Sequence, residues 1–125
     1  MSEINHLTDL VAWKKSYQLG IDIYSITKTF PKEELFGLTN QLRRAVISIS
    51  SNIAEGFARH SEKDKYHFCA IASGSACEVE SQLRIAFGVG YLSKELLDEL
   101  LLVVQGVQKV IAGLAKASHG ILSKD

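Results

Sequence analysis

The strongest constraint on this sequence is the spacing of its apolar residues, which recur every three to four positions through most of the chain. Between residues 39 and 57 this spacing selects one set of side chains: Leu42, Val46, Ile49, Ile53 and Phe57. Residues spaced in this way share one face of an α-helix, so we expect that face to enter a core. No stretch alternates apolar and polar residues strictly enough to indicate a strand. The sequence therefore predicts an all-α fold.

Proline, glycine and capping residues divide the chain into four predicted helices, at residues 10–29, 39–57, 62–89 and 93–116. Thr8 or Asp9 is expected to cap the first helix, which stops before Pro31 because a residue that precedes proline disfavours the helical backbone. Ser61 and Ser93 are placed to begin the third and fourth helices. Because the connections are short, we expect an antiparallel up-down-up-down four-helix bundle.

Composition limits the class of protein further. With 46% apolar and 22% charged residues, the 125-residue chain is expected to form one soluble domain, residues 1–125. Its 14 basic and 14 acidic residues cancel, so nucleic-acid binding would need a local patch. No uninterrupted apolar run approaches the roughly 20 residues of a membrane span, and the polar N-terminus is unlike a signal peptide. We therefore expect a cytoplasmic protein with no membrane partner.

The segment 93–116 carries more apolar residues than one face of a bundle helix requires. Its first stripe consists of Leu97, Leu100, Val104, Val107, Ile111 and Leu114. A second stripe, on a different face, consists of Leu96, Val103 and Val110. The simplest interpretation is that the first stripe packs inside the bundle and the second meets another subunit. Burial of this helix on most sides within its own chain is the alternative.

Motifs for metal binding and catalysis are not recognisable in the sequence. A di-metal bundle needs two Glu-x-x-His pairs, whereas this chain has one, Glu3 to His6, ahead of the first predicted helix. His60, His67 and His119 share no ligand spacing with the cysteines, and there is no glycine-rich phosphate loop or nucleophile elbow. We therefore predict a protein that is not an enzyme and has no metal or cofactor.

The two cysteines, Cys69 and Cys77, lie eight residues apart in a segment predicted to be helical. That spacing separates them by about 12 Å along a helix axis. Their α-carbons would then be too far apart for a disulfide between them. Because free cysteine is among the most buried residue types, we expect both to be reduced core or near-core residues.

Polar side chains form another stripe along the segment 39–57 and just beyond it: Gln41, Arg44, Ser48, Asn52, Glu55 and Arg59. A solvated helix face is the ordinary explanation of such spacing. Serine, asparagine and arginine also suit a hydrogen-bonded network at a subunit contact, or contacts to phosphate and base edges. We expect a structural polar network that contains Gln41, Ser48, Asn52 and Glu55. Asn52 and Glu55 should be partly buried, with Arg44 or Arg59 among their partners.

A weak basic patch is predicted between residues 43 and 65. Its five basic residues, Arg43, Arg44, Arg59, Lys63 and Lys65, outnumber the three acidic residues of the same stretch, which are Glu55, Glu62 and Asp64. Lysine and arginine supply the phosphate contacts of nucleic-acid-binding proteins. These five residues are therefore the candidate nucleic-acid-binding residues.

Several short motifs occur in a fixed order: Asp9-Leu10-x-x-Trp13-x-Lys15, Phe30-Pro31-x-x-Glu34-x-x-Gly37-Leu38, Gln41-x-Arg43-Arg44-Ala45, Ser48-Ile49-x-Ser51-Asn52-Ile53-Ala54-Glu55-Gly56, and Ala72-x-Gly74-Ser75 with Glu78 and Glu80. With these motifs, residues 9–92 resemble the bacterial four-helix-bundle family of 23S rRNA-intervening sequence proteins, also described as S23-like ribosomal proteins. Ser50 stands where that family commonly has proline. Because proline would kink a helix there, we expect a straighter second helix in this chain.

The resemblance implies an antiparallel bundle that assembles as a ring-shaped homo-oligomer, with a pentamer favoured. The family also includes accessory proteins of diversity-generating retroelements, which have been proposed to bind nucleic acid and a reverse transcriptase. Its ribosomal name reflects where some of the genes lie and does not demonstrate binding to that RNA. We therefore expect a non-enzymatic oligomer that binds RNA or DNA through the basic patch. The alternative is a protein-interaction scaffold or accessory subunit with no direct nucleic-acid contact.

Overall fold

The computed structural model of the protein describes residues 6–123, with side chains described through residue 117. This part of the chain contains four α-helices and no strand: α1 Val11–Thr27, α2 Leu38–Ala58, α3 Glu62–Gly88 and α4 Lys94–Ser123. Two short 3-10 helices accompany them, η1 Leu7–Asp9 and η2 Lys32–Glu34. The predicted all-α class and the number of α-helices are confirmed.

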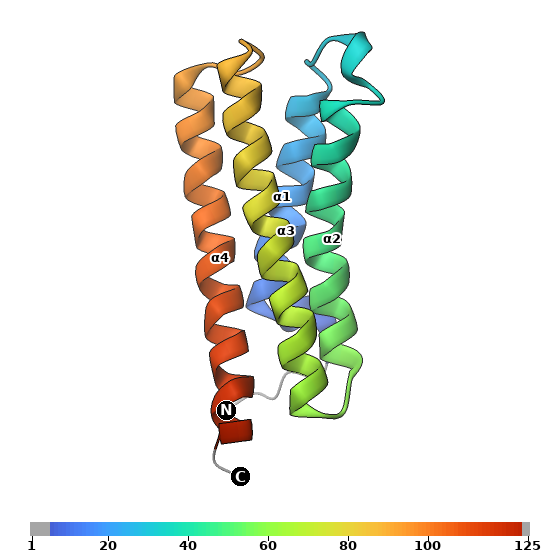
Figure 1. Ribbon diagram of the computed structural model, residues 1–125, viewed down its shortest axis with the longest axis vertical. Coiled ribbons are helices and arrows are strands. Elements are labelled where there is room, and N and C mark those ends of the chain that lie inside the picture. The colour runs from blue at the N-terminus through green and yellow to red at the C-terminus, as the bar shows by residue number, and fades with distance from the viewer. Residues whose placement is uncertain (1–5, 124–125) are drawn as a thin grey trace.

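The four α-helices lie along one common long axis (Figure 1). The α1–α2 and α3–α4 connections lie at the same end of the bundle, and the α2–α3 connection lies at the opposite end. Each helix packs against the next one in the chain, and α4 packs against α1. The most extensive packing is that of α3 against α2 and α4.

All four α-helices contribute aliphatic side chains to the core. Its largest fully buried side chains are Leu19, Ile23, Leu42, Val46, Ile49, Ile53, Val79, Leu83, Val104, Val107 and Ile111. Most of these belong to the apolar stripes of the sequence, so the period of 3.6 residues per turn sets which face of each helix points inward. Burying such a side chain contributes roughly 1.5–3 kcal/mol relative to leaving it exposed.

The predicted capping serines begin two of the α-helices. The Ser61 hydroxyl accepts the Asp64 N–H at 3.0 Å at the start of α3, and the Ser93 hydroxyl accepts the Leu96 N–H at 3.1 Å at the start of α4. At the start of α1, the prediction of a Thr8 or Asp9 cap is wrong. Both residues lie in η1, and the extended residue before α1 is Leu10, which makes no side-chain cap.

The end of α3 depends on the backbone conformation of Gly90. Gly90 has a φ of +90°, a conformation that side-chain-bearing residues rarely adopt. This turn lets the Tyr91 N–H donate to the Ala86 carbonyl at 2.8 Å, which satisfies a carbonyl in the last turn of the helix.

Helix α4 continues to Ser123, beyond the predicted end at residue 116. The prediction stopped where the apolar stripe ends, whereas no proline or turn signal interrupts the helix there. The span Lys94–Ala117 has a mean hydropathy of 1.5 and is long and apolar enough to cross a membrane by those measures alone. The core helix of a soluble protein can meet the same criteria, but it is mostly buried. Here Val104, Val107 and Ile111 are fully buried, whereas 28% of the apolar window as a whole is buried inside the chain.

The two cysteines occupy different environments. Both are free thiols, but Cys69 is buried and Cys77 is exposed, so the expectation that both lie in or near the core is wrong for Cys77. Eight residues advance a helix by about 80° beyond two full turns, which is enough to move a side chain off the buried face. Burial raises the pKa of the Cys69 thiol, and the charge of nearby Lys65 partly opposes that rise.

Helices α2 and α3 approach each other closely at Gly56. A β-carbon at this position would lie 3.1 Å from the Phe68 Cβ and 3.6 Å from the Lys65 carbonyl oxygen of α3. The same helix runs without a break through Ser50, the position where the related family commonly has proline. The glycine at the contact allows α2 to approach α3 closely.

Candidate functional site

The structure does not gather the five basic candidate residues into one surface. Arg43 points toward α1, where its Nε donates to the Thr27 hydroxyl at 2.9 Å and its guanidinium lies 4.6 Å from the centre of the Tyr24 ring. Arg44 follows directly in the chain but lies in a groove between α2 and α3. Adjacent residues of a helix point about 100° apart, so these two arginines serve different faces.

The other three basic residues lie near the α2–α3 connection. Arg59 forms a 3.0 Å ion pair with Glu55 and lies 5.0 Å from the centre of the Phe68 ring. Lys65 donates to the carbonyl oxygens of Gly56 and Phe57, each at 3.2 Å. It therefore satisfies carbonyls in the last turn of α2 and complements the helix dipole. Lys63 is exposed and forms no ion pair with any side chain that the structure describes.

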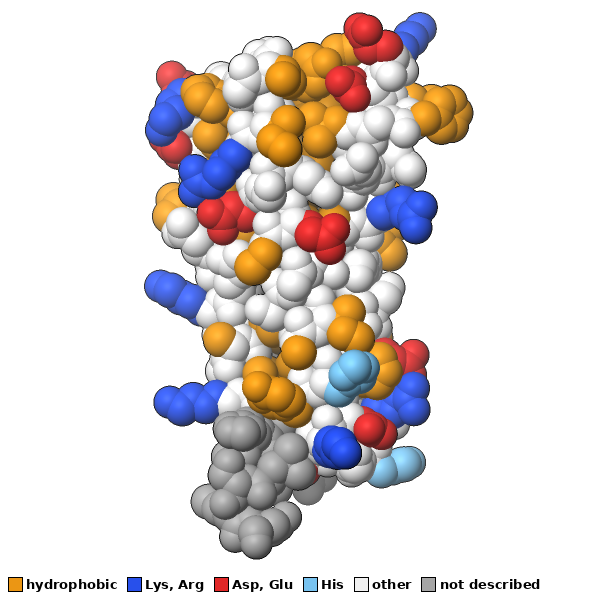
Figure 2. Space-filling view, viewed as in Figure 1, with side chains coloured by type: hydrophobic (Ala, Val, Ile, Leu, Met, Phe, Trp, Pro, Cys, Tyr) orange, Lys and Arg blue, Asp and Glu red, His pale blue; other side chains and the backbone are white. Residues whose placement is uncertain are grey.

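The basic candidates therefore lie in three places: Arg43 faces α1, Arg44 lines the groove between α2 and α3, and the other three lie near the α2–α3 connection. Arg59 directly follows α2 and is fifteen residues from Arg44, which corresponds to about 22 Å of helix. On the face drawn in Figure 2, basic and acidic side chains are interspersed and form no continuous basic area. The polar residues of α2 lie between Arg44 and Arg59.

The polar residues of α2 form a smaller network than expected. The Ser48 and Ser75 hydroxyls are hydrogen-bonded at 2.8 Å, which ties α2 to α3. Asn52 is partly buried, and its Nδ2 donates to the Ser48 carbonyl at 2.8 Å and to the Ser48 hydroxyl at 3.1 Å. The expectation of a partly buried, hydrogen-bonded Asn52 is confirmed, although its partner is a serine because the preceding turn lies within reach of the amide.

Two members of the expected network lie outside it. Glu55 is exposed, so its expected burial is wrong, although its expected partnership with Arg59 is confirmed by their ion pair. Gln41 is also exposed and lines the groove between α2 and α3. This groove has a volume of about 400 Å³ and is lined by Asn40, Gln41, Arg44, Ala45, Ser48, Glu78 and Gln82. Among the described side chains, the buried Oε1 of Gln82 is without a hydrogen-bond partner.

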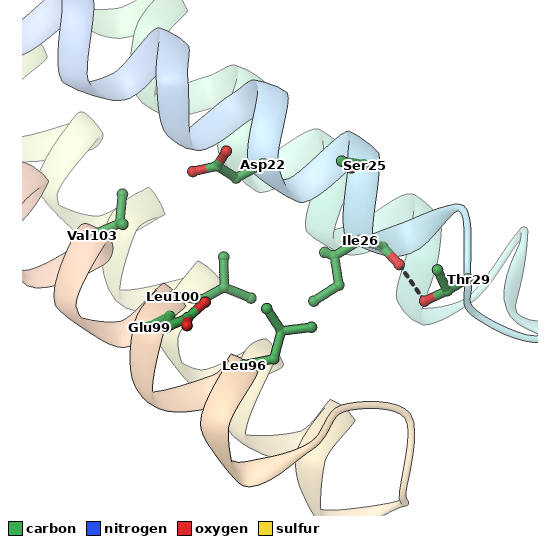
Figure 3. Close-up of a pocket in the computed structure, with 8 residues that line it drawn as sticks. All are labelled: Asp22, Ser25, Ile26, Thr29, Leu96, Glu99, Leu100 and Val103. Carbon is green, nitrogen blue, oxygen red and sulfur yellow. Dashed lines mark hydrogen bonds between the residues drawn. The ribbon is translucent and has the colours of Figure 1, made fainter.

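A second groove, of about 410 Å³, separates α1 from α4 (Figure 3). Ile26 of α1 and Leu96 and Leu100 of α4 point into the space between the two helices. Its other lining residues are Asp22, Ser25, Thr29, Glu99 and Val103. The structure thus places Leu96 and Val103, two of the three predicted interface residues, at this groove. Both are half-buried against the core, as is Val110 further along α4.

Glu34 and Tyr91 form a contact that the residue pattern did not predict. The Tyr91 hydroxyl donates to Glu34 Oε2 at 2.7 Å, and the Leu38 N–H donates to Glu34 Oε1 at 3.1 Å. The Phe30 ring lies 5.4 Å from the Tyr91 ring, centre to centre. Phe30, Glu34 and Leu38 all belong to one motif of the family resemblance. That motif was the signal in the sequence that marked these residues. The contact thus gives that motif a structural role.

These hydrogen bonds shift two pKa values in opposite directions. The pKa of Glu34 is lowered, first by the Leu38 N–H and then by the Tyr91 hydroxyl, because both donate to the charged carboxylate. The pKa of Tyr91 is raised mainly by its hydrogen bond to Glu34, since ionisation would destroy that bond.

Among the described side chains, no cluster of three or more histidine, cysteine, aspartate or glutamate residues could hold a metal ion. His60 and His67 are both exposed, and the His67 ring packs edge-on against Phe68. Glu3 and the side chain of His119 lie outside the described residues.

One solved structure shares this fold across nearly all of its own length. It is a protein of unknown function from the S23 ribosomal protein family of Bacteroides thetaiotaomicron VPI-5482, with a TM-score of 0.79 and 23% sequence identity. The match covers 85% of this chain and 99% of that one. At this identity, the likeness establishes the fold alone. No curated protein matches the sequence.

A family match covers most of the sequence. Residues 8–113 match the 23S rRNA-intervening sequence protein family. This range includes all of α1, α2 and α3 and most of α4, together with every motif on which the resemblance was based. The chain therefore belongs to the 23S rRNA-intervening sequence protein family.

Proposed function

We propose that this protein is a non-enzymatic, antiparallel up-down-up-down helical bundle that functions as a homo-oligomeric interaction scaffold. The observation that carries the proposal is the exposure of large apolar side chains on the outside of the bundle. Leu102 of α4 is 70% exposed, Ile47 of α2 is 48% exposed, and Tyr17 and Ile21 of α1 are 52% and 49% exposed. Tyr17, Ile21 and Ile47 line one shallow surface pocket, whereas Leu102 lies at a separate place on α4. Contiguous exposed apolar side chains mark interaction sites.

The composition of α4 supports the same proposal. Only 28% of the apolar window within Lys94–Ala117 is buried inside the single chain, despite its mean hydropathy of 1.5. Packing of the bundle core therefore accounts for only part of the apolar character of this helix. A contact with another subunit would remove more of that surface from water, at about 25 cal/mol per Å² of apolar area.

The oligomeric state tests this proposal directly. Size-exclusion chromatography with light scattering should give a mass that is a multiple of 13.8 kDa, the mass of one chain. The family resemblance favours a ring of five copies. A protein that stays at the mass of one chain throughout the micromolar range would overturn the proposal. A crosslinking ladder whose largest species is a hexamer or a dimer would support assembly and correct the stoichiometry.

Nucleic-acid binding is the second candidate function. It is favoured by Arg44 and Lys63, which form no ion pair with the described side chains, and by the family's association with ribosomal RNA genes. Arg43, Arg59 and Lys65 are engaged within the chain and are less available for phosphate. In an oligomer, even two free basic residues per copy would be repeated around the assembly and would act together through multivalency.

A fluorescence-anisotropy titration with structured RNA and with duplex DNA, each at two salt concentrations, tests this second function. Phosphate contacts should weaken as salt rises, with a log–log slope of about 0.9 for each phosphate neutralised on duplex DNA. The Arg44→Ala, Lys63→Ala variant should bind more weakly and show a shallower slope than wild type. Lys109→Ala, on exposed α4 surface, is the matched control. Absence of binding at low salt would leave the scaffold as the only proposed function.

A further inference from the structure

Five exposed residues of α1 form one continuous stripe, which we call the α1 ridge: Lys14, Tyr17, Ile21, Tyr24 and Lys28. They are separated by alternating steps of three and four residues, so they lie on one side of the helix. The centre of the ridge is apolar and aromatic, and both of its ends carry a lysine. Ile47 of α2 lies beside it, lining the same shallow surface pocket as Tyr17, Ile21 and Tyr24.

Neighbouring side chains hold the aromatic rings of the ridge in place. The Tyr17 ring stacks on Trp13 with 5.2 Å between ring centres. The Tyr24 ring lies under the Arg43 guanidinium, which Thr27 fixes through its hydroxyl. Rings that are already ordered lose little conformational entropy on binding. The ridge is therefore a preorganised, largely apolar surface whose five residues remain exposed in the described chain.

The groove between α1 and α4 has the complementary character. Its floor is aliphatic, with Ile26, Leu96 and Leu100, while Asp22 and Glu99 place carboxylates along its two sides. No lysine or arginine lines it. Asp22 accepts a 3.0 Å hydrogen bond from Gln18, and Glu99 forms no ion pair within the described part of the chain. A partner that combines apolar side chains with basic residues fits this chemistry.

We propose that the α1 ridge of one copy docks into the α1–α4 groove of the next copy. The aromatic and aliphatic side chains of the ridge would cover the floor of the groove, and Lys14 and Lys28 would meet Asp22 and Glu99. This inference rests on the proposed homo-oligomer and deepens it by naming the two surfaces that meet. Because the surfaces differ, the contact is head-to-tail, the kind that generates rings or filaments and not a simple twofold dimer.

One copy can use both surfaces at once. Ile21 and Asp22 are consecutive residues, so their side chains point about 100° apart around α1. The ridge of a copy therefore faces away from its own groove and is free to engage a neighbour. A row of copies therefore has a free ridge at one end and a free groove at the other. When these two surfaces meet, the row closes into a ring.

Charge reversal tests the proposal. The ridge variant Lys14→Glu, Lys28→Glu and the groove variant Asp22→Lys, Glu99→Lys each place like charges across the contact. Each should lower the mass in light scattering to that of one chain at concentrations where wild type stays assembled. All four substitutions in one chain should restore the assembly, because the charges are again opposite. Lys109→Glu is the control for a charge change elsewhere, and circular dichroism checks that each variant is folded.

The outcomes separate this inference from the proposed function. If wild type is assembled and either pair of reversals leaves its mass unchanged, the ridge and groove are not the interface, and the scaffold proposal stands. Assembly lost in both variants but not restored by the fourfold swap likewise overturns the pairing of these two surfaces. If wild type itself has the mass of one chain, the proposed oligomer fails and this inference fails with it.

Discussion

Tyr91 donates a 2.7 Å hydrogen bond to Glu34 and thereby joins the two connections at one end of the bundle. Glu34 belongs to the α1–α2 connection, and Tyr91 lies between α3 and α4. The other oxygen of Glu34 accepts the Leu38 N–H at the start of α2. One carboxylate thus caps the start of α2 and links the two connections through a residue that is 57 positions away in the chain.

Tyr91→Phe should lower the melting temperature by a few degrees at neutral pH, because it removes the donor and leaves one carboxylate oxygen without its partner. The Phe30–Tyr91 ring contact should survive in this variant, which confines the change to the hydroxyl. Thermal unfolding followed by circular dichroism measures the effect. An unchanged melting temperature would contradict a stabilising role for the bond.

The stability of the wild type should also depend on pH through this pair. The folded-state pKa of Glu34 is lowered from 4.5, so its contribution is present above that value and is lost as pH falls through the lower folded-state pKa. The folded-state pKa of Tyr91 is raised from 10.0, so its contribution is present below that value and is lost as pH rises through the raised pKa. Melting temperatures across both windows should fall less steeply for Tyr91→Phe than for wild type.

Gly37→Ala should destabilise the same end of the bundle. A β-carbon at this position would lie 2.7 Å from Glu34 Oε1, the atom that accepts the Leu38 N–H. The carboxylate would have to move, and its bonds to Leu38 and Tyr91 would lengthen or break. We expect a lower melting temperature and a pH dependence closer to that of Tyr91→Phe. A stability equal to that of wild type would show that the carboxylate relaxes without loss.

Glycines in two helices should respond oppositely to alanine. Gly56→Ala pushes a β-carbon to within 3.1 Å of the Phe68 Cβ, so α3 would have to shift, at a cost of about 1–3 kcal/mol. Gly74→Ala meets nothing within 4 Å and should stabilise the single chain by up to about 1 kcal/mol through helix propensity. Urea unfolding of both variants provides the comparison. Equal effects would contradict the close approach at Gly56.

Asn52→Ala should lower the free energy of unfolding by about 1 kcal/mol, because it removes two hydrogen bonds to Ser48 in a partly buried site. Ser51→Ala, at an exposed neighbouring position, is the matched control. If Asn52→Ala left stability unchanged, the structural interpretation of this residue would be wrong.

A double-mutant cycle between Ser48 and Ser75, whose hydroxyls are hydrogen-bonded, should show a coupling free energy of about 0.5–1.5 kcal/mol.

The sequence by itself determined the elements of this fold. The apolar period of segments such as Leu42 to Ile53 specifies a helix and the face that it buries, and Ser61, Ser93 and Gly90 mark where helices begin or end. These signals are local, because a cap or a helical stripe depends on residues within a few positions of one another. Even the misplaced boundaries follow local rules: a 3-10 turn precedes α1, and α4 continues where no stop signal occurs.

Only the tertiary structure decided which side chains meet across the bundle. The basic patch looked compact in sequence, yet Arg43 faces α1 while Arg59 pairs with Glu55 and Lys65 satisfies the end of α2. The Glu34–Tyr91 bond joins two connections that are far apart in the sequence. The ridge and the groove lie on different sides of α1 because the groove also needs α4 beside it. Helical periodicity gives the angle of a side chain about its own axis. The neighbour that it meets depends on how the four helix axes pack. Residue spacing within one helix favours certain crossing angles but does not fix which side chains of another helix it meets.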